Sequence, residues 1–192
     1  MRQRTLGTLA AIAATLVCAA LVVSALQQAA RNSKLPLTNS SIIREQAAAK
    51  RLDPALIAAV IYAETRFEPR PSPAGAQGLM QILPATAYYL ARLSGGSAFT
   101  ARDLASPRVN VAYGSYYLRY LLDHYGGNEM LAVAAYNGGL ANVDRWVAQA
   151  VGAGRTLTVE AIPFPETREY VQRVLSAQRA YRATYPRALG LL

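Results

Sequence analysis

Apolar residues recur at helical spacing along most of this chain after residue 40. In residues 54–67, Leu56, Ile57, Val60 and Ile61 follow one another at spacings of one and four, which places them on one face of a helix. Beyond residues 156–160, no segment alternates convincingly between apolar and polar positions. The pattern therefore predicts an all-α fold. Helices are expected over residues 40–51, 54–67, 84–93, 107–125, 129–136, 140–150 and 165–185.

Capping residues and prolines indicate where several of these helices begin and end. Asp53 and Pro54 form an N-cap followed by a first-turn proline, and Asn128 can cap the helix predicted over 129–136. The sequence Asn-Gly-Gly at 137–139 is typical of a helix end, because glycine adopts the left-handed conformation without strain.

A long apolar run without charged residues, 6–26, precedes the helical part of the chain. At about 1.5 Å per residue it nearly spans a bilayer core of about 30 Å, and it exceeds the usual apolar region of a signal peptide. We therefore predict that residues 1–27 are an uncleaved membrane anchor or a signal peptide cleaved after Ala25, with the anchor favoured. Residues 28–39 are expected to form a short polar tether, and residues 40–192 the exported domain.

The net charge and the cysteine content narrow the kinds of partner and chemistry that are expected for this domain. The 192 residues carry 20 Lys and Arg against 11 Asp and Glu, a formal net charge of +9. Such a charge favours an anionic partner, such as nucleic acid, a phospholipid surface or an anionic wall polymer. The only cysteine, Cys18, lies in the apolar run, so the domain has neither a disulfide nor a thiol nucleophile.

Glu64 stands out because it continues the apolar face of its helix, three positions after Ile61 and four after Val60. One interpretation is that its carboxylate ends the face, reaches solvent and pairs with Arg66 or Arg70. The other is that it loses water, which raises its pKa and makes it a general acid near neutral pH. The face alone does not decide between these two.

The segment after Glu64 favours a binding loop. Prolines at 69, 71 and 73 and glycines at 75 and 78 build a rigid turn in which main-chain groups can approach a ligand, and Gln81 adds an amide.

Four stretches together resemble a known family: "ETRF" at 64–67, "SPAGAQGLMQILPATA" at 72–87, "AAYNGG" at 134–139 and "IPFPETREYV" at 162–171. In this order they are similar to the catalytic domain of soluble lytic transglycosylases, the SLT family related to goose-type lysozymes. The resemblance covers roughly residues 40–185.

The resemblance implies a lysozyme-like helical fold with one catalytic acid and base, which Glu64 matches. It implies a sugar groove lined by the other residues that match its motifs. Thr65 stands where the family usually has Ser, and Leu83 where it often has Met. The groove residues expected on this basis are Thr65, Ser72, Met80, Gln81, Leu83, Tyr136, Asn137 and Glu166.

The implied reaction is cleavage of the bond between N-acetylmuramic acid and N-acetylglucosamine in peptidoglycan. Glu64 would protonate the glycosidic oxygen and then take the proton of the muramyl C6 hydroxyl. A 1,6-anhydromuramyl product then forms without water, because the attacking hydroxyl belongs to the same sugar. Such an enzyme needs one protein carboxylate, whereas ordinary glycosidases use two. Glu166 is the obvious second carboxylate, but a glutamate in a first helical turn is also favoured by the helix dipole.

Other functions remain open at this stage. A lysozyme would hydrolyse the same bond, and a wall-binding protein would hold glycan without cutting it. A nucleic-acid binder is disfavoured by the predicted export and the lack of a basic recognition motif. We expect no metal or cofactor, because His124 has no neighbouring ligand residues in the sequence and no phosphate-binding loop occurs. The expected partners are peptidoglycan strands, the membrane through residues 1–27, and anionic wall polymers, in a bacterial cell envelope.

Overall fold

The computed structural model describes residue 17 and the ranges 35–70, 72–95 and 98–192. The anchor or signal peptide predicted over residues 1–27, with its cleavage site and Cys18, lies outside these residues except for Val17, as does most of the predicted tether. Residues 36–192 form one compact unit. Among the described helices, none combines the length and the apolarity needed to cross a membrane.

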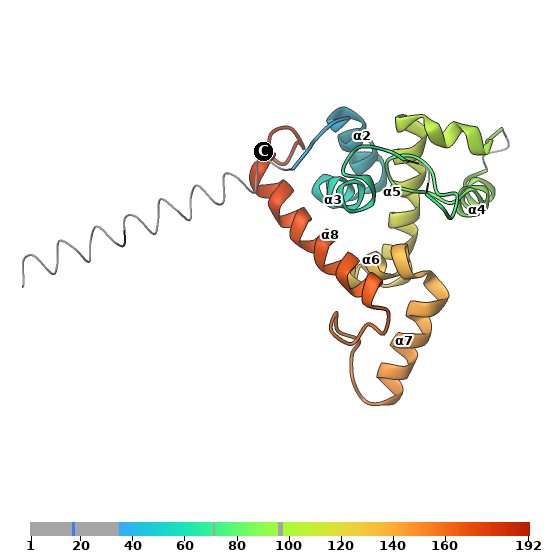
Figure 1. The fold of residues 1–192 in the computed structure, drawn as a ribbon, viewed down its shortest axis with the longest axis vertical. Helices are drawn as coiled ribbons and strands as arrows, with labels where there is room; N and C mark the ends of the chain where they lie inside the picture. The colour runs from blue at the N-terminus through green and yellow to red at the C-terminus, as the bar shows by residue number, and fades with distance from the viewer. Residues whose placement is uncertain (1–16, 18–34, 71, 96–97) are drawn as a thin grey trace, which may run out of the picture. The chain divides into compact units, whose positions relative to one another are not determined.

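The compact unit is built from helices, as Figure 1 shows. Within the described ranges there is no strand, and the only β-type pairing is an isolated bridge between Gln77 and Ile82. The all-α prediction is confirmed, whereas the alternating segment at 156–160 forms no strand. The elements are α2 (Ser40–Lys50), α3 (Pro54–Thr65), α4 (Pro84–Ser94), the 3₁₀ helix η1 (Ala101–Ala105), α5 (Pro107–His124), α6 (Glu129–Gly138), α7 (Leu140–Gly152) and α8 (Pro165–Thr184).

Side-chain caps begin two of the helices as the sequence predicts. Asp53 Oδ1 accepts a hydrogen bond from the Ala55 amide at 3.0 Å, and Asn128 Oδ1 accepts one from the Leu131 amide at 3.1 Å. Each bond satisfies an amide that has no partner within the helix. The short helix η1 was not predicted. It begins with a capping box, in which Asp103 Oδ2 accepts hydrogen bonds from the Thr100 amide and hydroxyl.

Helix α3 is the centre of the core. Its residues Ala55–Ile61 are all at most 1% exposed. The prediction of a single buried face was therefore too narrow, because the alanines between the large apolar residues are buried as well. A helix that is apolar on all sides must be surrounded by other elements. Helix α3 packs along α8 and also contacts α2.

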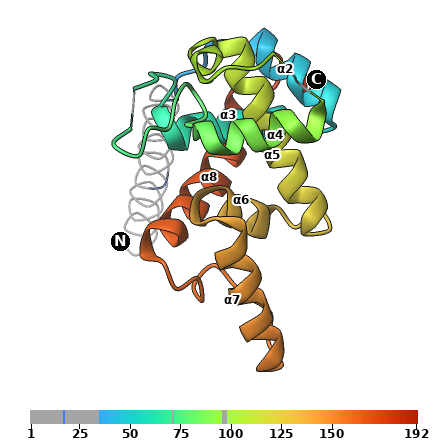
Figure 2. The ribbon, with the colours of Figure 1, turned by 90° about the vertical axis from the view of Figure 1, so that its right-hand side faces the viewer.

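Helix α8 ties down both ends of α3. At the start of α3, Asp53 Oδ2 accepts hydrogen bonds from Gln178 Nε2 at 2.7 Å and from the Arg182 guanidinium at 3.0 Å. At the other end, Tyr170 reaches Glu64. Helices α6 and α7 lie near the N-terminal end of α8 in both views (Figures 1 and 2). This arrangement fixes α3 along its length and places Glu64 beside α8 and the loop that follows α3.

Candidate active site

A pocket of about 450 Å³ opens at the C-terminal end of α3. Four of the residues predicted for the site line it together: Glu64, Thr65, Ser72 and Gln81. The remaining lining residues are Ala63, Arg66, Glu68 and Arg70. The end of α3 and the loop after it thus form a single concave surface, as the sequence predicted for this segment.

The carboxyl group of Glu64 is partly exposed and bonded to α8. Tyr170, which is buried, donates a hydrogen bond from its hydroxyl to Glu64 Oε1 at 2.7 Å. Burial raises the pKa of Glu64 to about 7 from its ordinary value of 4.5. Loss of water disfavours the charged form and is the largest cause. At neutral pH this carboxyl is therefore divided between an acid and a base form.

Three neighbours modify the pKa of Glu64. The hydrogen bond from Tyr170 favours the carboxylate and lowers the pKa, and the positive charge of Arg173 acts in the same direction. The negative charge of Glu166 raises it. All three groups belong to α8. Polar and charged groups of α8 therefore adjust the pKa of a carboxyl carried by α3, which burial has already raised.

The alternative in which Glu64 pairs with Arg66 or Arg70 is wrong. Arg66 places its guanidinium 5.9 Å from the ring centre of Tyr62, and Arg70 forms an ion pair with Glu68 at 3.2 Å. Glu68 therefore takes the partner that had been considered for Glu64. Both glutamates line the pocket, but the Glu68 side chain is 75% exposed to solvent, whereas Glu64 is largely buried.

Thr65 connects the end of α3 to the loop that follows it. Its Oγ1 lies 2.8 Å from the Leu79 carbonyl and 3.1 Å from the Ile61 carbonyl, so its single proton is committed to the main chain. Ser72 Oγ accepts a hydrogen bond from the Ala76 amide at 2.9 Å. Both hydroxyls hold the loop in shape.

Gln81 is held in a strained backbone conformation, with φ 48°. Its Nε2 donates to the carbonyls of Gly78 at 2.8 Å and Arg70 at 3.0 Å. These bonds close the loop on itself. A side chain held in this way is positioned before any ligand arrives, and backbone strain of this kind is found where the surrounding structure enforces it.

Asn110 of α5 anchors the same loop from inside the protein. Its Oδ1 accepts a hydrogen bond from the Met80 amide at 2.8 Å, and its Nδ2 donates to the carbonyls of Gln77 and Leu104 at 2.8 and 3.1 Å. Gly78 makes this approach possible, because a Cβ there would lie 2.1 Å from Asn110 Nδ2. The helical pattern of α5 did not single out Asn110, because periodicity does not show which distant backbone groups a polar side chain will bond.

Met80, Leu83 and Tyr136 do not line the pocket. The Met80 side chain is fully buried against Gly114, and its carbonyl accepts a hydrogen bond from the Tyr136 hydroxyl at 3.0 Å. Leu83 is the exposed residue before α4. Tyr136 is partly exposed, and burial together with the charge of Glu64 raises its pKa well above the usual range.

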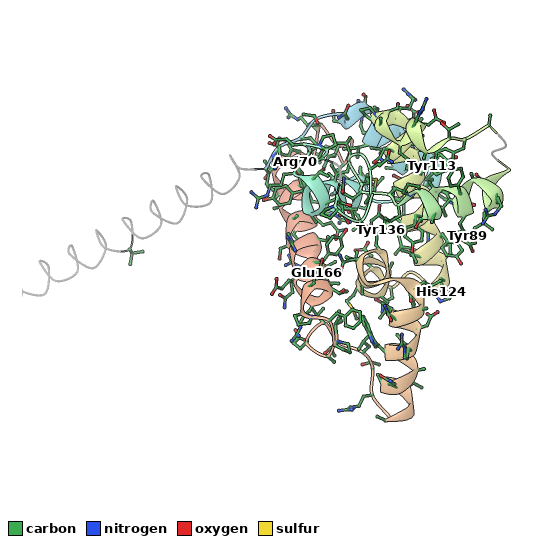
Figure 3. The ribbon with its side chains drawn as sticks, turned by 45° about the vertical axis from the view of Figure 1, so that its right-hand side comes forward. Arg70, Tyr89, Tyr113, His124, Tyr136 and Glu166 are labelled. Atoms are coloured by element: carbon green, nitrogen blue, oxygen red, sulfur yellow. The ribbon has the colours of Figure 1, made fainter. Side chains whose placement is uncertain are left out.

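Asn137 and Glu166 lie at the junction of α6 and α8. Asn137 Oδ1 accepts a hydrogen bond from the Thr167 hydroxyl at 2.8 Å. Glu166 is exposed in the first turn of α8. In the view of Figure 3, Tyr136 lies between Glu166 and Tyr89. The structure thus brings four of the nine predicted residues onto the pocket, and the other five do not line it.

Sequence reasoning missed Tyr170, Thr167, Asn110 and Glu68. Tyr170 and Thr167 belong to the stretch "IPFPETREYV", so the signal for both was present. Glu68 follows Glu64 by four positions and could have been found as a second carboxylate near it. In the part of the chain that the structure describes, no three His, Cys, Asp or Glu side chains come together in a way that could hold a metal ion.

Comparison with known proteins gives a consistent picture. Residues 41–157 match the family described as "Transglycosylase SLT domain". The chain is 32% identical over 152 residues to the soluble lytic murein transglycosylase of Escherichia coli, covering 78% of this chain and 24% of that protein. It is 31% identical over 163 residues to the membrane-bound lytic murein transglycosylase C of Yersinia pestis, covering 73% and 46%. The chain spans about a quarter to a half of the length of these relatives.

Solved structures agree with the sequence comparison. The 70 kDa soluble lytic transglycosylase of Escherichia coli superposes with a TM-score of 0.73 at 32% identity, covering 78% of this chain and 25% of that one. An inactive variant of the lytic transglycosylase Slt from Pseudomonas aeruginosa, in which glutamine replaces a glutamate, gives a TM-score of 0.70 at 33% identity, covering 78% and 24%. A complex of the 70 kDa enzyme with bulgecin A gives 0.72 at 33% identity, covering 78% and 25%.

Proposed function

This chain belongs to the family of transglycosylase SLT domains, and on that premise we propose that it is a peptidoglycan lytic transglycosylase. It cleaves the β-1,4 bond between N-acetylmuramic acid and N-acetylglucosamine and leaves 1,6-anhydromuramyl ends. The proposal rests on one observation: the Glu64 carboxyl lies on the pocket and has a pKa raised to about 7. The inactive glutamate-to-glutamine variant of the Pseudomonas relative supports a catalytic glutamate in this family.

Glu64 serves as acid and then as base. In its protonated form it donates a proton to the glycosidic oxygen, while the 2-acetamido group of the muramyl sugar stabilises the anomeric carbon. The resulting carboxylate then accepts the proton of that sugar's C6 hydroxyl, whose oxygen bonds to the anomeric carbon. A group with a pKa near 7 suits both steps, because neither protonation state is far from the operating pH.

The other predicted residues are assigned supporting roles. We assign the Ser72 hydroxyl proton and the Gln81 Oε1 to the substrate, because both residues line the pocket and their internal hydrogen bonds use Ser72 Oγ as acceptor and Gln81 Nε2 as donor. Thr65, Met80 and Asn137 would act mainly by holding the wall of the groove, since their polar groups are bonded within the protein. Tyr136, Leu83 and Glu166 lie outside the pocket and are assigned to sugars further along the strand.

A lysozyme-type hydrolase is the second candidate, because Glu68 places another carboxylate on the pocket. Hydrolysis needs such a group as nucleophile or as the base that activates water. Two observations weigh against Glu68 in this role. Its side chain is 75% exposed and paired with Arg70 at 3.2 Å. A solvated, ion-paired carboxylate at the rim contributes little to a reaction inside the pocket.

The products distinguish the two reactions. Purified sacculi would be digested with the full chain, and the released muropeptides analysed by mass. Anhydromuramyl ends support the lyase, and reducing muramic ends would overturn it. Glu64→Gln should abolish release, whereas the matched variant Glu68→Gln should retain it. Reducing ends that disappear in Glu68→Gln would establish the hydrolase, and an inactive wild type that still binds glycan would favour a wall-binding protein.

We further propose that the enzyme works in the cell envelope, with residues 1–27 as an anchor or signal, residues 28–39 as a tether and residues 40–192 as the catalytic domain. The support is the uncharged apolar run 6–26 and the existence of a membrane-bound relative. Cell fractionation and sequencing of the mature N-terminus would test this. A mature protein that begins after Ala25 would exclude the anchor.

Anionic wall polymers are proposed as a further partner. The net charge is +9, and α8 carries exposed arginines at 173, 179 and 182. Contacts between exposed charges weaken as salt rises. Binding of the protein to purified walls should therefore fall between low and high salt, and binding that is the same at both would remove this partner.

A further inference from the structure

Four tyrosines from three helices form a continuous series of ring contacts beside the pocket. Tyr136 of α6 lies 5.3 Å from Tyr117 of α5, measured between ring centres, and Tyr117 lies 6.4 Å from Tyr120. Tyr120 in turn lies 6.2 Å from Tyr89 of α4. The last ring is 40% exposed, and the other three are partly exposed.

The far end of this series also carries polar groups. The hydroxyls of Tyr89 and Tyr120 are hydrogen-bonded at 3.3 Å. The negative charge of Asp144 is close enough to affect Tyr120. Asp144 Oδ1 accepts a hydrogen bond from the Tyr125 hydroxyl at 3.0 Å and lies 2.9 Å from His124 Nε2. Ring faces, hydroxyls and a carboxylate thus occur side by side.

This combination matches the chemistry of a sugar ring. A pyranose in the gluco series has apolar C–H faces that pack on aromatic rings, and a rim of hydroxyls that both donate and accept hydrogen bonds. Tyrosine offers both kinds of contact, since its ring is apolar and its hydroxyl is polar. A residue that only filled the core would need the apolar ring and not the hydroxyl.

The near end of the series reaches the proposed catalytic centre. The Tyr136 hydroxyl donates to the carbonyl of Met80, which directly precedes the pocket residue Gln81. The charge of Glu64 raises the pKa of Tyr136, so the two groups are electrostatic neighbours. Figure 3 shows Tyr89 and His124 on the opposite side of Tyr136 from Glu166. The series of tyrosines therefore begins next to the proposed catalytic centre and extends from Tyr136 to Tyr89.

We propose that Tyr89 and Tyr120, here called the outer tyrosine pair, bind a sugar ring of the same peptidoglycan strand, beyond the bond that is cleaved at Glu64. This inference rests on the proposed function and deepens it by giving the enzyme a preference for long strands. The pair holds the strand on the surface and takes no part in proton transfer.

Helix α4 offers a matched control for testing the pair. Tyr88 and Tyr89 are neighbours with nearly equal exposure, 43% and 40%. Tyr88 packs on Phe99 at 5.3 Å, away from the series, whereas Tyr89 packs on Tyr120. Tyr89→Leu and Tyr88→Leu therefore remove the same ring from the same helix, and leucine keeps an apolar side chain with good helix propensity. Thermal unfolding of both variants would establish that they are folded.

The variants would be compared on long glycan strands and on the shortest fragment that the wild type cleaves. Tyr89→Leu should raise KM for long strands about three- to tenfold, as expected for one lost ring contact, with little change in kcat. The rise should be smaller for the short fragment, and Tyr88→Leu should behave as the wild type on both. Equal KM values for Tyr89→Leu and Tyr88→Leu on long strands would overturn the proposal.

A binding measurement tests this inference independently of the proposed reaction. Affinity for purified soluble strands would be measured by calorimetry in the Glu64→Gln background, with and without Tyr89→Leu or Tyr88→Leu. A selective loss of affinity in Tyr89→Leu supports the outer tyrosine pair even if the wild type proves to be a hydrolase or a binding protein. Unchanged affinity overturns the pair even if the wild type releases anhydromuropeptides.

Discussion

Glu64→Gln is expected to raise the free energy of unfolding above pH 7, although it removes the proposed catalytic acid. Burial holds the pKa of Glu64 at about 7, compared with 4.5 for an ordinary glutamate. A glutamine of the same size carries no charge at any pH. Its amide oxygen can still accept the hydrogen bond that Tyr170 donates at 2.7 Å in the wild type. The substitution therefore removes a charge and leaves the local packing in place.

The magnitude follows from the difference in pKa between the folded and unfolded states. Below pH 4.5 the carboxyl is protonated in both states, so the two proteins should differ little. Between pH 4.5 and 7 the unfolded chain releases this proton while the folded protein keeps it, so the free energy of unfolding falls as pH rises. One pKa unit corresponds to about 1.36 kcal/mol, which gives a loss of about 3 kcal/mol above pH 7.

The assay is chemical denaturation of the wild type and Glu64→Gln over this pH range. The wild type should lose stability relative to the variant as pH rises, and the difference should level off above pH 7. Taking the difference cancels the titration of all other groups, which both proteins share. A difference in unfolding free energy that is constant across the range would refute the reasoning, because Glu64 would then titrate alike in both states.

Three further predictions follow from the contacts around the pocket. Tyr170→Phe removes a hydrogen bond that favours the carboxylate of Glu64, so the pKa of Glu64 should rise. The fall of kcat/KM at alkaline pH should therefore move to higher pH, and a pH profile that does not move would contradict this. Asn110→Leu leaves the Met80 amide without its buried partner and should lower the free energy of unfolding by about 3 kcal/mol in urea denaturation, so a near-normal stability would show that the loop does not depend on Asn110. Gly78 and Gly75 both have a left-handed backbone, with φ of +72° and +80°, but only a Cβ at Gly78 would meet a neighbour, 2.1 Å from Asn110 Nδ2. Gly78→Ala should therefore destabilise the protein by about 2 kcal/mol more than Gly75→Ala. Equal losses of stability in thermal unfolding would argue against the clash.

Much of the helical framework could be predicted from local pattern. Each predicted helix exists, and the caps at Asp53 and Asn128 form as expected, because helix ends depend on residues close in sequence. The sequence pattern predicted less well which residues of α3 are buried. Alanines such as Ala58 and Ala59 read as neutral positions, yet both are fully buried, since packing against several helices decides their environment.

The site shows the same division between local and distant contacts. The apolar face of its helix marked Glu64 as a candidate for a poorly hydrated carboxyl, but that face alone did not exclude a solvated carboxylate. Its bond to Tyr170 joins residues 106 positions apart, and the bond from Met80 to Asn110 joins residues 30 positions apart. No periodic pattern encodes such pairs. The ion pair of Arg70 with Glu68 is local, but an exposed arginine has several acceptors within reach, and the pattern does not rank them.

The pairing of α3 with α8 has a consequence for the order in which the candidate active site forms. Helix α8 follows α3 by about a hundred residues, so Tyr170, which donates a hydrogen bond to Glu64, is synthesised long after Glu64 itself. Until α8 docks against α3, Glu64 lacks the hydrogen bond from Tyr170 and the contacts that α8 makes with its helix. Contacts between segments so distant in sequence form late in folding, because the intervening loop must close first. The proposed reaction is thus expected to require that the last helix is in place.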